Sequence, residues 1–107
     1  MSGRLLLQPK KQGETCYTSA PFDFISVLSP SETISTQVVT ATVYQGVDAS
    51  PSSIISGSAV VQNVTLVNQL LTAGVVGVIY ELLCRITTSL GQTLEQAALL
   101  AVIPDIP

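Results

Sequence analysis

The sequence predicts an all-β protein, an antiparallel β-sandwich of about seven strands that follows an extended N-terminal arm. Turn-forming residues interrupt the chain every roughly eight to twelve residues, which is the spacing typical of a small sandwich. Between residues 39 and 44 the chain alternates apolar residues with Thr and Tyr, which is the period of a strand buried on one face. The 107 residues have room for one core, so a single domain is expected.

The first strands are separated by clear breaks. They are expected at residues 21–29, 33–44, 58–62 and 64–71. Pro30 closes the first of them because proline opposes strand continuation, and Asn63 separates the last two. The segment 45–57 contains Gly, Asp and Pro, so it is either one long loop or a turn followed by a short strand at 53–56.

The end of the chain predicts a hairpin, Val78–Thr88 and Thr93–Val102 joined by the turn "SLGQ". In its first strand Glu81 and Arg85 share the outward face and are candidates for partner contacts. The core face carries Tyr80, Leu82, Cys84 and Ile86. Residues 93–102 also fit a helix, with Thr93 and Gln96 as a capping box. A strand is favoured there because so apolar a first strand needs a partner.

Tyr80 stands near the start of that strand, shortly after Gly77. Sandwiches of the immunoglobulin type place a tyrosine at this point, and its hydroxyl ties down a neighbouring loop. The same role is expected of Tyr80.

Charged residues are scarce and unevenly distributed. They make up 10% of the chain, against a usual share of about 25%, while 47% is apolar. A surface with so few charges indicates that much of it faces other protein. The first eleven residues carry three positive charges, whereas the remainder carries one positive and seven negative charges, a net of −6.

These positions predict a docking arm at residues 1–20, a sandwich domain at 21–103 and a short tail at 104–107. The arm offers an apolar plug flanked by cations, and Pro9 favours an extended conformation before it. The candidate partner-binding residues of the arm are Arg4, Leu5, Leu6, Leu7, Lys10 and Lys11. Three cations without aromatic neighbours do not make a specific nucleic-acid site.

The sequence contains no histidine, which removes the usual general base and the commonest metal ligand. No phosphate-binding glycine loop is present, and the carboxylates are scattered along the chain. We therefore expect no enzyme activity, no cofactor and no metal. Membrane-spanning and secretory segments are not expected either. Maturation in a reducing cytoplasm would keep Cys16 and Cys84 as thiols, with a disulfide between them as the open alternative.

The chain resembles the fibre-tail adaptor proteins of tailed bacteriophages over residues 21–102. The matching positions are Phe22 to Phe24, Leu28, Pro30, Glu32 to Ile34, Thr42, Val43, Leu71, Gly74, Gly77, Tyr80, Leu82, Ile86 to Thr88, Gly91, Thr93 and Glu95. The resemblance implies an immunoglobulin-like β-sandwich that is assembled in the host cytoplasm and binds other virion proteins in multiple copies. The chain departs from the family pattern in its longer basic arm and in the tail "IPDIP".

That resemblance implies a non-enzymatic virion protein at the tail or head-tail interface, where it docks fibres or neighbouring virion proteins. The alternative is a capsid decoration (cement) protein that binds the major capsid protein, and its higher copy number would distinguish it. A soluble ligand-binding sandwich is a third class, and it would require a polar pocket.

Overall fold

The computed structural model describes residues 5–7, 9–18, 22–24, 27–62 and 65–104. The strands are very short at the beginning of the chain and long afterwards. In order they are β1 (Leu5–Leu6), β2 (Lys10–Lys11), β3 (Cys16–Tyr17), β4 (Phe22–Asp23), β5 (Ile34–Gln45), β6 (Ile55–Gln62), β7 (Leu66–Leu71), β8 (Ile79–Thr88) and β9 (Thr93–Ile103). One turn of 3-10 helix, η1 (Pro51–Ile54), leads into β6.

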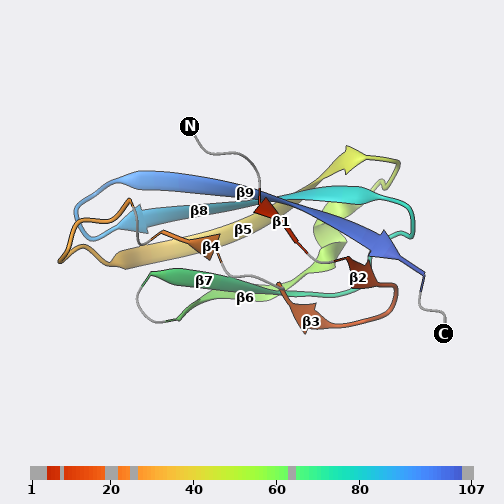
Figure 1. Ribbon diagram of the computed structural model, residues 1–107, viewed down its shortest axis with the longest axis horizontal. Helices are drawn as coiled ribbons and strands as arrows, with labels where there is room; N and C mark the ends of the chain where they lie inside the picture. Colours follow the sequence, from red (N-terminus) through yellow and green to blue (C-terminus); the bar gives the residue numbers. More distant parts are fainter. Residues whose placement is uncertain (1–4, 8, 19–21, 25–26, 63–64, 105–107) are drawn as a thin grey trace.

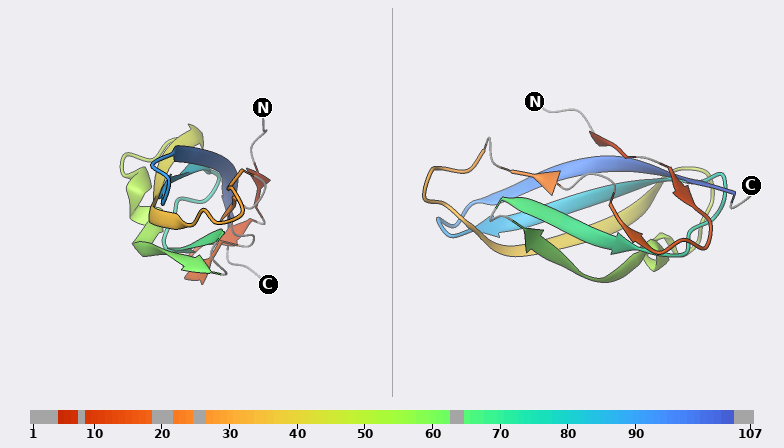
Figure 2. Two further views of the ribbon diagram at one scale, coloured as in Figure 1. Left: turned by 90° about the vertical axis from the view of Figure 1, so that its left-hand side faces the viewer. Right: turned by 60° about the horizontal axis from the view of Figure 1, so that its bottom comes forward.

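Two sheets face each other and form an elongated sandwich of 46 × 23 × 20 Å (Figures 1 and 2). The five-stranded sheet has the order β5-β8-β9, with β1 and β2 both paired to the far side of β9. The four-stranded sheet has β7 between β6 on one side and β3 and β4 on the other. The order β5-β8-β9 matches strands C, F and G of immunoglobulin domains. When β3 and β4 are counted as one interrupted strand, the other sheet matches strands B, E and D, with β7 as strand E and β6 as strand D. The predicted all-β sandwich is therefore confirmed.

The hairpin β8–β9 forms the centre of the larger sheet, as predicted. Burial in β8 alternates strictly, with Tyr80, Leu82, Cys84 and Ile86 completely buried. β9 pairs with β8 from Thr93 to Ala101, so residues 93–102 are strand and the helical alternative is excluded. The opposite sheet contributes Phe22, Phe24, Val67 and Leu71 to the same core.

The N-terminal segment belongs partly to the sandwich. β1 and β2 run parallel to β9, with Leu5 opposite Ala98 and Lys10 opposite Val102. The backbone then turns and β3 pairs with β7, so the segment passes from one sheet to the other. The other strand pairs are antiparallel, as predicted, and the parallel pairing of β1 and β2 is an addition that the sequence did not indicate. Parallel pairing joins residues distant in sequence and leaves no local turn signal, so the sequence pattern does not reveal it.

Three predicted strands have different bounds in the structure. Within 21–29, the described residues 22–24 and 27–29 contain only the short β4, because the chain turns at 27–28, where the backbone amides of Val27 and Leu28 donate to Phe24 O. The first half of the expected strand at 53–56 lies in η1, since Pro51 starts a helical turn. The second half begins β6, which is one strand from Ile55 to Gln62 with a bulge. β7 begins at Leu66, and residues 63 and 64 lie outside the described part.

Candidate interaction surfaces at the two ends of the sandwich

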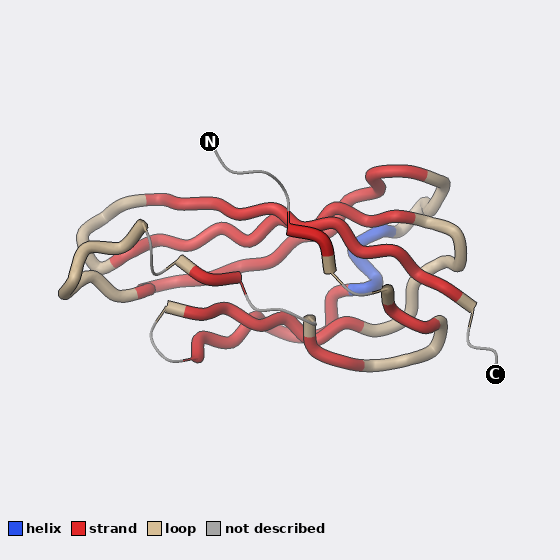
Figure 3. The backbone as a smooth tube through the Cα atoms, in the orientation of Figure 1, coloured by secondary structure: helices blue, strands red, loops and turns tan. Residues whose placement is uncertain are grey.

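The loops of the sandwich gather at its two ends, because the long strands all run along the long axis (Figures 1 and 3). We call the loops 46–50 and 72–78 the Tyr80 end. We call the loop 27–33 and the turn 89–92 the Glu32 end. Loops carried by a rigid scaffold are where binding residues usually lie. The two ends are therefore the candidate interaction surfaces of the sandwich.

Tyr80 connects the two loops of its end. Its ring is completely buried, and its hydroxyl donates to Asp48 Oδ2 at 2.6 Å while accepting from the Val75 N–H at 2.8 Å. Burial and the hydrogen bond to Asp48 raise the pKa of Tyr80. The same bond, with a second from the Ser50 N–H, lowers the pKa of Asp48. The predicted loop-tying role of Tyr80 is confirmed.

The loop 72–78 has an unusual backbone. Ala73 has a φ of 51° and Gly74 a φ of 102°, a region that L-residues rarely adopt. A Cβ at Gly74 would lie 2.9 Å from Val102 Cγ2, so glycine also permits the close approach of β9. The Lys10 Nζ donates to Ala73 O at 2.7 Å and to Lys11 O at 3.0 Å. Lys10 of the N-terminal segment thus holds the loop 72–78 through the carbonyl of Ala73.

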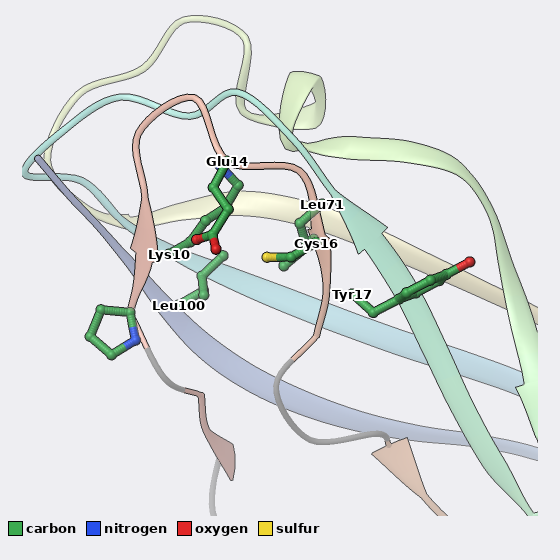
Figure 4. Close-up of a pocket in the computed structure, with 7 residues that line it drawn as sticks. Lys10, Glu14, Cys16, Tyr17, Leu71 and Leu100 are labelled. Carbon is green, nitrogen blue, oxygen red and sulfur yellow. The ribbon is translucent and has the colours of Figure 1, made fainter. Parts of the chain in front are cut away.

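Lys10 lies beside a hollow of about 220 Å³ between the N-terminal segment and the two sheets (Figure 4). Its wall includes Glu14, Cys16, Tyr17, Leu71 and Leu100. Burial, and secondarily the charge of Glu14, raise the pKa of the Cys16 thiol. Burial raises the pKa of Cys84 to about 12. Both cysteines are free thiols, and the raised pKa values favour the protonated form, which is the less reactive one.

Apolar side chains protrude from the Tyr80 end although its backbone is fixed. Val47 is 86% exposed, Val75 43% and Val76 36%. Val47 directly precedes Asp48, and Val75 donates to Tyr80, so the two loops that carry these valines are tied together by one hydroxyl. A small apolar surface held in a defined position is suited to contact with another protein.

The Glu32 end is built on a second carboxylate. Glu32 is 3% exposed and accepts hydrogen bonds from the Thr88 hydroxyl and from the Ser29 N–H. These bonds, the Thr88 bond foremost, lower the pKa of Glu32. Thr33 and Ser89 join the loop to the hairpin turn through a pair of hydrogen bonds, at 3.0 and 2.8 Å.

The exposed apolar residues of the Glu32 end are Leu90, at 62%, and Val27, at 50%. Leu90 sits in the hairpin turn, where its N–H and that of Gln92 donate to the Thr88 hydroxyl. A hollow of about 370 Å³ lies along residues 28–33 and Thr65. Both ends therefore present apolar side chains on hydrogen-bonded loops.

The family of the chain follows from sequence comparison. The family described as "Podophage GP4 fiber-tail adaptor protein gp77" matches residues 12–101, a range that includes both ends and the central hairpin. The chain belongs to the Gp77 family of podophage fibre-tail adaptors. Comparison with curated proteins gave no match, and comparison with solved structures gave none.

Members of the Gp77 family are structural proteins of the virion. No group of three or more His, Cys, Asp or Glu residues is arranged to hold a metal ion in that part of the chain. Among the described residues, no helix has the length and apolarity that crossing a membrane requires.

The predicted arm residues of this Gp77 protein have different surroundings. Arg4 lies outside the described residues, and Leu5 and Leu6 form β1. Leu7 is 4% exposed and Lys10 is 2% exposed, so the chain's own core and the loop 72–78 use these two side chains. Lys11 is exposed, and its N–H donates to Glu14 Oε1 at 3.1 Å. All six predicted arm residues, from Arg4 to Lys11, precede residue 12, where the family match begins.

Glu81 and Arg85 lie on the outer face of the larger sheet, as predicted from the alternation of β8. Arg85 forms an ion pair with Glu95 of β9, at 2.6 Å between Nη2 and Oε2, and both side chains are about half exposed (57% and 41%). An exposed pair of this kind adds little stability. Glu81 occupies the row between Thr42 and Leu99.

The protruding valines and Leu90 were not predicted as site residues. Their signal in the sequence is weak, because apolar residues in "YQGVDAS", "TAGVVG" and "SLGQ" look like strand ends or turn interiors. Only the placement of those loops at the ends shows that the side chains protrude.

Proposed function

We propose that this Gp77 protein is a non-enzymatic adaptor that joins the phage tail to a fibre through contacts at its two ends. The observation that carries the proposal is the presence of exposed apolar side chains on fixed loops at both ends of a 46 Å sandwich. A connector needs two separate contact surfaces, and the ends of an elongated domain are the most widely separated surfaces it has. Several copies per particle are expected, one for each fibre attachment point.

The experiment uses two paired variants in assembled particles. Val47→Ser with Val75→Ser alters the Tyr80 end, and Val27→Ser with Leu90→Ser alters the Glu32 end. One pair is expected to abolish incorporation of the adaptor into tails. The other is expected to allow incorporation but to yield particles without fibres. Quantitative mass spectrometry of purified particles measures both components.

Val60→Ser is the matched control, because Val60 is 44% exposed but lies on β6, outside the loops of both ends. It is expected to give normal adaptor and fibre content. Normal particles from both paired variants would overturn the proposal that the ends make the contacts. The N-terminal residues Arg4, Leu5, Leu6 and Lys11 and the outer-face residues Glu81 and Arg85 remain proposed secondary contacts. Truncation of residues 1–6, which keeps the buried Leu7 and Lys10, together with Lys11→Ala tests the former.

A further inference from the structure

We propose that the free edge of β5 is a pairing surface for a second copy of this chain, which adds its own β5 antiparallel to the first. In the described part of the chain, β5 is hydrogen-bonded to β8 on one side and is the last strand of its sheet on the other (Figure 1). An edge strand presents a row of main-chain donors and acceptors that another strand can satisfy.

The other sheet edges are protected in known ways. The opposite edge of the same sheet consists of the two-residue strands β1 and β2, with Pro9 and two lysines. The edge strand β6 has a bulge between Ser56 and Val60, and Gln69 Nε2 fills it by donating to Ser56 O and Gly57 O at 3.1 and 3.2 Å. Short strands, Pro, Lys and bulges all hinder pairing with another chain. The remaining edge consists of β3 and β4, which have two residues each.

Along its middle β5 has no proline, charge or bulge, and Gln37 Nε2 donates to Ala59 O of β6 in the other sheet at 3.0 Å. It is 12 residues long, and its pairing with β8 is regular from Thr36 to Val43, with irregularities only near its ends. The sequence from Thr33 to Val47 contains neither a charged residue nor a proline. A long, regular and uncharged edge strand is the type that pairs with another strand.

The composition of the strand favours a second copy as the occupant. Its outward side chains, Thr36, Val38, Thr40 and Thr42, are exposed and β-branched. Threonine and β-branched residues pair favourably across strands, and two copies bring no like charges together along this stretch. An antiparallel pair of identical strands has two-fold symmetry, which is the commonest arrangement of homo-oligomers.

The outer face of the sheet is hollowed between β5 and its partner β8. A hollow of about 190 Å³ is lined by Val38, Thr40, Leu83 and Arg85. Val38 is 50% exposed in the single chain and would be covered by a neighbour. Pairing over the regular stretch buries less than the ~800 Å² per partner of a standard stable interface. The association is therefore weak in solution and depends on concentration.

The test compares two variants of opposite charge at Thr40, which lies in the middle of the regular stretch. Thr40→Lys and Thr40→Glu each place like charges opposite or diagonal to each other in the antiparallel pair. Sedimentation equilibrium of the full chain is expected to show self-association of the wild type and its weakening by about tenfold or more in each variant. An equal mixture of the two variants is expected to associate again, because Lys then faces Glu.

Thr93→Lys is the control, since Thr93 is exposed on the same sheet but lies on β9. It is expected to associate like the wild type. A circular dichroism spectrum identical to that of the wild type establishes that each variant is folded, and Thr42→Lys replaces a Thr40 variant that is not. A monomeric wild type, unchanged association of the Thr40 variants, or failure of the mixture to associate would each overturn the second-copy assignment. These results do not depend on the valine and leucine variants of the two ends.

Discussion

The Tyr80 end and the Glu32 end are each fixed by a hydrogen bond between a loop carboxylate and a hydroxyl of β8, but the hydroxyl belongs to a different kind of side chain at each end. At each end of β8 a loop carboxylate accepts a hydrogen bond from a hydroxyl of the strand, Asp48 from Tyr80 and Glu32 from Thr88. The Tyr80 hydroxyl belongs to a large, completely buried ring at the start of β8, whereas the Thr88 hydroxyl belongs to a small side chain at the end of β8. Loop position is therefore coupled to core packing at one end and chiefly to local hydrogen bonds at the other.

The largest expected effect comes from Tyr80→Ala. It removes a completely buried ring, which typically costs about 3–5 kcal/mol of unfolding free energy. Tyr80→Phe keeps the ring and removes only the hydroxyl, so its cost is expected to be about 1–3 kcal/mol. Urea unfolding measures both. Equal costs for the two variants would mean that the ring itself contributes nothing, and would remove the difference between the ends.

Leu7→Ala tests whether the N-terminal segment supports the Tyr80 end in particular. Leu7 is buried in the core cluster, and truncation of a buried leucine costs about 2–5 kcal/mol. Amide hydrogen exchange is expected to accelerate at residues 73–78, which Lys10 holds through Ala73, more than at residues 29–33. The exposed Lys11→Ala is the control and should leave both loops unchanged. Equal acceleration at both loops would show that the segment serves the whole fold.

Thr88→Val probes the Glu32 end without changing side-chain size. The Thr88 hydroxyl donates to Glu32 and accepts from the amides of Leu90 and Gln92, so its loss is expected to cost about 1–3 kcal/mol. The hairpin turn should then exchange its amide hydrogens faster, while Val75 should not. A cost as large as that of Tyr80→Ala would contradict the assignment of this end to local hydrogen bonds.

Acid is expected to weaken both ends, and base only the Tyr80 end. The pKa values of Asp48 and Glu32 are lowered from 3.8 and 4.5, so the stability that these carboxylates contribute is present above those values and is lost as the pH falls below them. The pKa of Tyr80 is raised from 10.0, so its contribution is present below that value and is lost as the pH rises through the folded pKa.

Unfolding free energy as a function of pH, for the wild type and for Tyr80→Phe, separates the two carboxylates. Tyr80→Phe removes the main cause of the Asp48 shift and leaves the Glu32 shift. The variant should therefore lose less stability than the wild type between about pH 4 and pH 2, but not reach zero loss. An unchanged acid profile would mean that Asp48 gains nothing from Tyr80.

The smallest effects on stability are expected from the protruding side chains. Val47→Ser and Leu90→Ser change residues that are 86% and 62% exposed, so each should alter the unfolding free energy by less than about 0.5 kcal/mol. Their effects on assembly are expected to be large in the particle experiment. A substantial loss of stability from either change would indicate that the side chain supports its loop instead of contacting a partner.

Much of the fold was predictable from local patterns. The alternation in β5 and β8 predicted their buried faces, and the turn "SLGQ" predicted the central hairpin. Tyr80 was predicted to tie down a loop because its place in the strand is distinctive. The interaction surfaces were less predictable. Leu7 and Lys10 look like exposed arm residues in the sequence, yet both are buried in the structure.

The sequence by itself determined that this chain is a β-sandwich of the phage adaptor type, with no histidine and few charged residues. These properties follow from composition, periodicity and turn residues, which act over a few neighbouring positions. The tertiary structure alone decided that β1 and β2 join β9 in parallel and that Asp48 and Val75 meet at Tyr80. It also decided that β5 has a free edge. Such contacts join residues distant in the sequence, and they form only because burial of one common core brings those residues together.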